Sequence, residues 1–166
     1  MVRKIVAMAV AVLLSGCQVR TEYGKIRNTN APKGGEVDTK VFSIIDTAKI
    51  YEQVGAIDTA HNETLQNVKQ EFVKFYSNGK IATFSNYDPN DVSSLNPRKA
   101  DMGFYEYKDQ NLKVRFFFKH PQGGGWVKGV YKKTVNDDFY MTSGSLLIRY
   151  KIRNLPRKFL IYKPDW

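Results

Sequence analysis

Two segments of this chain alternate between apolar and polar residues, and this pattern limits the possible folds more than any other feature. Residues 112–119 place leucine, valine and phenylalanine at every second position, with mostly basic residues between them. Residues 146–153 repeat the arrangement, with Arg149, Lys151 and Arg153 on one side of the alternation. A period of two puts alternate side chains on opposite faces of a strand, so each segment predicts a β-strand with one buried face and one solvated face.

Further segments are rich in aromatic and β-branched residues and are separated by turn-forming sequences. Asn78-Gly79 predicts a tight hairpin, and residues 109–111, 136–137 and 142–144 predict similar turns. Longer loops are expected at residues 121–125 and 86–101. The additional strands are expected at residues 48–54, 68–76, 80–85, 102–108, 126–135, 138–141 and 158–163.

Consecutive strands joined by short turns form an antiparallel meander, and about eight such strands tend to close into a barrel. Residues 41–54 fit a helical stripe and a strand about equally well, so we expect a short helical or irregular lead before the first strand. The predicted fold class is therefore an all-β antiparallel barrel, occupying residues 41–166 of the 166-residue chain.

The N-terminus has the three-part order of a secretion signal. Arg3 and Lys4 form a short basic region, residues 5–14 are uninterruptedly apolar, and Ser15-Gly16 precede Cys17. The apolar run is about half the ~20 residues that a membrane-spanning helix needs. The sequence therefore predicts a cleaved signal at residues 1–16 and no permanent transmembrane helix. Residues 17–40 are polar, contain the pair Gly34-Gly35 and predict a flexible tether.

The quartet Leu14-Ser15-Gly16-Cys17 resembles the lipobox of bacterial lipoproteins. This resemblance implies diacylglycerol on the Cys17 thiol, cleavage before Cys17 and acylation of the new amino terminus, which together anchor the protein stably to a membrane. The expected location is the bacterial cell envelope. Gln18 stands where an Asp retains some lipoproteins in the inner membrane, so the same resemblance favours the outer membrane.

Residues 75–80, 96–105 and 112–118 together resemble the lipocalin-like domains of small bacterial lipoproteins. The resemblance implies a cup-shaped barrel that holds a small hydrophobic molecule. The typical Gly-x-Trp motif of a first lipocalin strand is missing. A ligand-binding barrel is expected to have a cavity lined by residues such as Phe116, Phe118 and Tyr150.

Catalytic and metal-binding patterns are missing from the sequence. His61 and His120 have no second ligand at metal spacing, and the only cysteine, Cys17, is expected to carry lipid. We therefore expect no enzyme activity, no metal and no cofactor. The formal net charge of +10 points to an acidic partner, but export from the cytoplasm argues against nucleic acid.

Two functions remain open from the sequence. The first is a membrane-anchored barrel that binds a small apolar or amphipathic ligand. The second is a non-enzymatic envelope protein that contacts another protein, an anionic glycan or lipid through its surface and the 86–101 loop. The basic residues near the C-terminus are interpreted first as a solvated face of the barrel, and second as a surface for such an envelope contact. These residues are Arg149, Lys151, Arg153, Arg157, Lys158 and Lys163.

Overall fold

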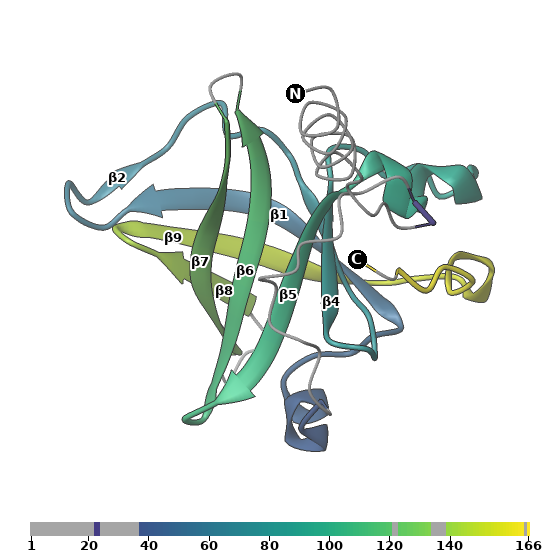
Figure 1. The fold of residues 1–166 in the computed structure, drawn as a ribbon. Helices are drawn as coiled ribbons and strands as arrows, with labels where there is room; N and C mark the ends of the chain where they lie inside the picture. The colour runs from purple at the N-terminus through teal and green to yellow at the C-terminus, as the bar shows by residue number, and fades with distance from the viewer. Residues whose placement is uncertain (1–21, 24–36, 121–122, 134–138, 165) are drawn as a thin grey trace, which may run out of the picture.

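A computed structural model describes residues 22–23, 37–120, 123–133, 139–164 and 166, with the backbone alone for 118–120, 123–124 and 133. Nine strands form one antiparallel sheet, in which neighbours in sequence are mostly neighbours in space (Figure 1). The strands are β1 (Lys49–Asp58), β2 (Glu63–Thr64), β3 (Phe72–Phe75), β4 (Lys80–Phe84), β5 (Asp101–Lys108), β6 (Asn111–His120), β7 (Gly123–Lys133), β8 (Phe139–Ser143) and β9 (Leu146–Asn154).

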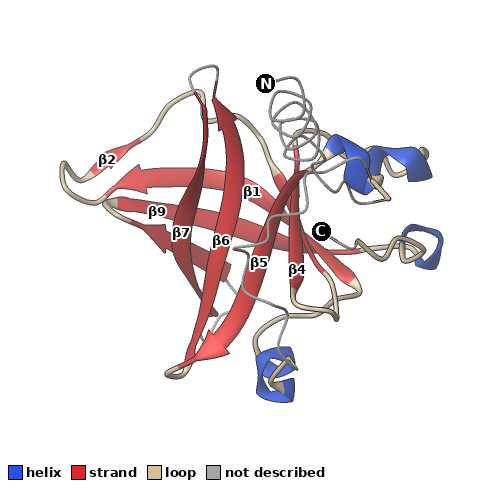
Figure 2. Cartoon of the chain, in the orientation of Figure 1, coloured by secondary structure: helices blue, strands red, loops and turns tan. Residues whose placement is uncertain are grey.

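Pairing between the first and last long strands closes the sheet. β1 runs antiparallel to β9 along its whole length, from Lys49 opposite Asn154 to Asp58 opposite Leu146. The two-residue β2 only extends the far end of β1, so the closed structure is an eight-stranded antiparallel barrel (Figure 2). Closure removes the free edges on which further strands or other chains pair. The predicted all-β barrel is confirmed.

The tight turns lie where their sequences predicted them. Gly79, between β3 and β4, has φ +77°, and Gly144, between β8 and β9, has φ +58°. Asp109 and Gln110, between β5 and β6, also have positive φ values of 54° and 60°. Such angles match the right-handed twist of the flanking strands, which explains why these short connections fix the hairpins. The turn expected at residues 136–137 lies outside the described residues.

The barrel interior is filled mainly by aromatic side chains. Phe75 is fully buried and makes edge-to-face contacts with Tyr51, Tyr105 and Tyr131 at centroid distances of 5.1, 5.5 and 5.5 Å. Tyr131 stacks on Phe139 at 4.8 Å. Geometries of this kind stabilise aromatic pairs beyond their burial alone. A short helical lead, the 3₁₀ helix η1 (Thr39–Ser43), contributes Val41 to the same inner cluster, and Ile45, just after the helix, joins it.

A second hydrophobic cluster lies on the outer surface of β3, β4 and β5. It buries Phe72, Phe84 and Phe104, which point away from the barrel interior. Two segments cover these side chains: the 86–100 connection, which contains the 3₁₀ helices η2 (Val92–Leu95) and η3 (Pro97–Lys99), and the C-terminal segment with η4 (Arg157–Phe159). These strands are therefore buried on both faces.

Three expectations about local structure were wrong. Residues 158–163 form no strand, because β1 already pairs with β9 and leaves no edge, and because the segment buries Phe159 on the outer cluster instead. Gly123–Gly125 belong to β7 rather than to a loop, since they pair with the end of β6. The 86–101 connection contains two helical turns, whose starts are capped by the side chains of Asp91 and Asn96.

Candidate ligand cavity beside strands β1 and β9

A cavity of about 750 Å³ lies between η1 and strands β1 and β9. This volume falls within the range of roughly 300–1,000 Å³ that is usual for small-molecule sites. The cavity is lined by Phe42, Ser43, Ile44, Ile45, Asp46, Lys49, Tyr51, Val54, Arg149, Tyr150, Lys151 and Ile152.

One part of the lining is apolar. Tyr51 and Tyr150 reach it from the inner cluster, where they are 1% and 3% exposed, and Ile152 packs against the same cluster. Phe42 and Val54 are each 42% exposed and are available to contact a ligand. Val54 stands in this position because the register of β1 shifts between Gln53 and Gly55, which forms a bulge and redirects a side chain.

The other part of the lining is cationic. Lys49, Arg149 and Lys151 contribute three positive charges, and the only carboxylate in the lining is that of Asp46. Lys49 lies 4.0 Å from Asp46, between Nζ and Oδ2. Within the residues that the structure describes, Arg149 and Lys151 form no ion pair, so their charges are free to meet an anion. The alternation of β9 explains this arrangement, since it exposes both cations beside the buried Tyr150.

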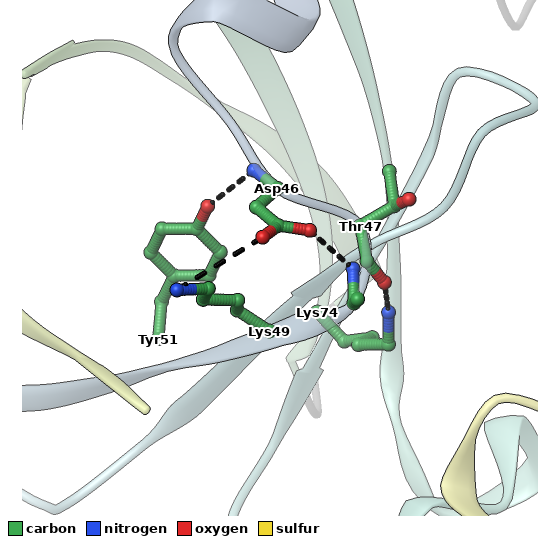
Figure 3. A network of polar contacts seen from close by, with 6 residues as sticks. Asp46, Thr47, Lys49, Tyr51 and Lys74 are labelled. Carbon is green, nitrogen blue, oxygen red and sulfur yellow. Dashed lines mark hydrogen bonds and ion pairs between the residues drawn. The ribbon is translucent and has the colours of Figure 1, made fainter. Parts of the chain in front are cut away.

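A polar network fixes the chain between η1 and β1 at the cavity (Figure 3). The backbone N–H of Asp46 donates to the Tyr51 hydroxyl at 2.8 Å, and the N–H of Ala48 donates to the Asp46 carboxylate at 2.8 Å. Burial raises the pKa of Tyr51 to about 12, so its hydroxyl stays protonated at neutral pH. The Lys74 ammonium group donates to the backbone carbonyls of Thr47 and Phe75 behind this loop.

The three residues predicted to contact a ligand lie in different surroundings. Tyr150 lines the cavity. Phe116 packs against the inner cluster from β6 and does not line this cavity, while the side chain of Phe118 lies outside the described part of the structure. Sequence analysis missed Lys49 and Phe42, and it assigned Arg149 and Lys151 to the solvated face, because their meeting depends on barrel closure and on the position of η1.

The inner cluster contains one unusual polar atom. The Tyr131 hydroxyl is completely buried and makes no well-formed hydrogen bond to a described group, although the Tyr150 hydroxyl lies close to it. Burial raises the pKa of Tyr131 well above its usual value, and the neighbouring Tyr150 adds to the effect. A buried hydroxyl without a partner costs about 1–3 kcal/mol of stability.

The described residues present neither a metal site nor a membrane-spanning helix. No group of three His, Cys, Asp or Glu side chains lies close enough together there to hold a metal ion. His61 is 75% exposed and its Nδ1 lies 2.9 Å from Asp58 Oδ2, an arrangement typical of a surface histidine. The described residues also include no helix of the length and hydrophobicity required to cross a bilayer. His120 has no described side chain, and Cys17 and the predicted signal lie outside the described residues.

The fold and the cavity define the class of this protein: it is a closed eight-stranded antiparallel β-barrel with an amphipathic cavity at β1 and β9. In comparisons with known proteins, no family model, no curated protein and no solved structure matches the chain.

Proposed function

We propose that this chain is a lipid-anchored protein of the bacterial cell envelope whose lipocalin-like barrel binds a small amphipathic anion without catalysing a reaction. The observation that supports this most directly is the cavity, which combines apolar side chains with three cations and one carboxylate. The lipobox-like quartet ending at Cys17 supports the anchor and the envelope location. An amphipathic ligand would place its apolar part against Phe42 and Tyr51 and its anionic group near Arg149 and Lys151.

The ligand site is tested with two fluorescent probes of similar shape. Anilinonaphthalene sulfonate is an amphipathic anion, whereas N-phenylnaphthylamine lacks the sulfonate. Reversing both rim charges with Arg149→Glu and Lys151→Glu should weaken binding of the anionic probe at least tenfold, which corresponds to about 1.4 kcal/mol. Binding of the neutral probe should change less than twofold.

The matched control is Lys128→Glu with Lys132→Glu, which reverses two exposed charges on β7 away from the cavity. This variant should bind both probes as the unaltered chain does. Equal loss in the control and in the rim variant would show that net charge alone governs binding, and the proposed site would be wrong. Native mass spectrometry of the protein extracted from its host then identifies any bound molecule. A reproducibly empty protein would favour the alternative, an envelope protein that contacts a protein or glycan through its surface.

The anchor is tested separately with Cys17→Ser. This change should abolish metabolic labelling with palmitate and release the protein to the soluble fraction. Retention of the label in the variant would exclude Cys17 as the lipidated residue.

A further inference from the structure

The C-terminal segment packs against the outer cluster at both of its ends. Leu155 and Phe159 are 7% and 2% exposed, and Trp166 is 4% exposed. The Trp166 indole N–H donates to the carbonyl of Gly103 at 3.0 Å, and the Asn78 amide donates to the carbonyl of Pro164 at 2.7 Å. The residues between these contacts are therefore held in a defined position.

Between the contacts of Leu155 and those of Pro164 and Trp166, residues 157–163 form a turn that we name the C-terminal tip. Its two central residues, Leu160 and Ile161, are 38% and 64% exposed, and Ile161 is the most exposed large apolar side chain among the described residues. Single exposed apolar residues are common on protein surfaces, whereas Leu160 and Ile161 form an adjacent exposed pair in a segment that hydrogen bonds hold in place.

Basic residues surround this apolar pair. Arg157, Lys158 and Lys163 are all exposed, and Asp165 is the only acidic residue in the last twelve positions of the chain. A cavity of about 310 Å³ lies beside Leu160, and Lys163 and Asn78 contribute polar groups to its lining. Apolar side chains flanked by lysine and arginine are typical of surfaces that enter the interface of an anionic membrane.

The beginning of the mature chain reaches the same side of the barrel. The Arg98 guanidinium, on η3, donates to the backbone carbonyl of Glu22 at 3.2 Å. Tyr23 and Tyr162 both lie near enough to Tyr76 to raise its pKa, after the larger effect of burial. Tyr162 belongs to the C-terminal tip, so residues 22–23 lie on the same side of the barrel as the tip.

Chain length then limits how far the anchor stands from the tip. Glu22 lies five positions after Cys17, and a fully extended chain spans at most about 18 Å over five positions. If Cys17 carries lipid, as proposed above, the bilayer surface lies within this reach of the face formed by η3 and the C-terminal segment.

We infer that the C-terminal tip is a second membrane contact, at which Leu160 and Ile161 enter the interface of an anionic phospholipid bilayer. Arg157, Lys158 and Lys163 meet the lipid phosphates, while the aliphatic parts of the lysines accompany the apolar pair into the interface. The position of the anchor rests on the proposed function, but the exposure and charge of the tip do not. The contact fixes the orientation of the barrel, which a lipid anchor on its own leaves free.

The experiment places an environment-sensitive fluorescent amino acid at position 161 by codon suppression in the full chain. A second preparation carries the same residue in place of Glu63, an exposed position on β2 at the opposite end of the barrel from the C-terminal segment (Figure 1). Both proteins are reconstituted into vesicles of phosphatidylcholine with or without phosphatidylglycerol, and quenching by spin-labelled lipids reports contact with the bilayer.

The label at position 161 should shift to shorter wavelength and be quenched by the lipids in vesicles that contain phosphatidylglycerol, whereas the label at position 63 should remain in water. The double variant Lys158→Glu, Lys163→Glu should reduce the membrane-contacting fraction at least tenfold, since each cation near an anionic surface contributes about fivefold in affinity.

Three results would overturn the inference. A label at position 161 that stays in water would show that the tip does not touch lipid. Equal quenching in neutral and anionic vesicles, or no effect of the double variant, would exclude recognition of anionic lipid. A label that is shielded only in native envelopes and never in lipid vesicles would assign the tip to a protein partner. None of these results depends on whether the cavity at β1 and β9 binds a ligand.

Discussion

The buried ammonium group of Lys74 should make the stability of this barrel rise between pH 8 and pH 10. Lys74 is 3% exposed, and burial lowers its pKa from 10.5 to about 8, although Asp46 acts in the opposite direction. Below pH 8 the folded and unfolded chains both hold the proton. Above pH 8 the folded chain loses it first, so the unfolded chain binds more protons and raising the pH favours folding.

The size of the effect follows from the two pKa values. The complete shift of about 2.5 units corresponds to about 3 kcal/mol, and about 2 kcal/mol of it should develop between pH 7.5 and pH 9.5. Buried tyrosines act in the opposite direction at higher pH, because burial raises the pKa values of Tyr51, Tyr105 and Tyr150 to about 12. The stability that these tyrosines contribute is lost as the pH rises above 10. The measurement therefore stops at pH 9.5.

The perturbation is Lys74→Met, which keeps an unbranched side chain as far as Cε and removes the titrating group. Urea unfolding of residues 18–166, which include every described residue, is followed by circular dichroism at pH 7.5, 8.5 and 9.5. Relative to the variant, the unaltered chain should gain about 2 kcal/mol of unfolding free energy over this range. Subtracting the variant also removes the tyrosine contribution, since both proteins share it.

The control is Lys128→Met, at an exposed lysine on β7, which should leave the pH dependence of the unaltered chain intact. If the difference between the unaltered chain and Lys74→Met stays constant within about 0.5 kcal/mol from pH 7.5 to 9.5, Lys74 titrates alike in both states. The reasoning from burial would then be refuted.

Two matched pairs of substitutions test the interior by urea unfolding at neutral pH. Tyr131→Phe removes the buried hydroxyl that makes no well-formed hydrogen bond to a described group and should raise the free energy of unfolding by about 1 kcal/mol. Tyr105→Phe removes a hydroxyl that donates to the carbonyl of Tyr76 and should lower the free energy of unfolding by a similar amount. A destabilised Tyr131→Phe would mean that the Tyr131 hydroxyl has a partner. Gly103→Ala should cost about 1–3 kcal/mol, because its Cβ would lie 2.6 Å from the carbonyl oxygen of Arg115, while Gly55→Ala, with nothing within 4 Å, should change stability by less than about 0.5 kcal/mol. Equal effects of the two alanines would contradict the packing at Gly103.

Local patterns were enough to predict most of the strands and most of their turns. The alternation in residues 112–119 and 146–153 placed Leu112, Val114 and Tyr150 inside the barrel and Arg149 and Lys151 outside, as the structure confirms. Tight turns depend on a few adjacent residues, so Asn78-Gly79 determined its hairpin without help from the rest of the chain. Periodicity and turn chemistry are properties of neighbouring residues, and the sequence displays them directly.

The candidate cavity could be predicted only in part, because local patterns do not show which distant residues meet. Tyr150 was named from the alternation of β9, but most of the other groups in the lining come from residues 42–54, about a hundred residues earlier in the chain. Their meeting requires β1 to pair with β9 and a bulge to turn Val54 toward the cavity. No local pattern specifies such a register between distant strands.

The sequence by itself determined that this chain forms an antiparallel β-structure with short hairpins, since strand periodicity and turn chemistry are local. The tertiary structure decided that β1 and β9 are the strands that close the barrel, that the C-terminal residues cover the outer cluster instead of forming a strand, and that three cations border one apolar cavity. These outcomes depend on contacts between residues far apart in the chain, where burial of large side chains and the pairing of free edges select one arrangement among many that local preferences permit.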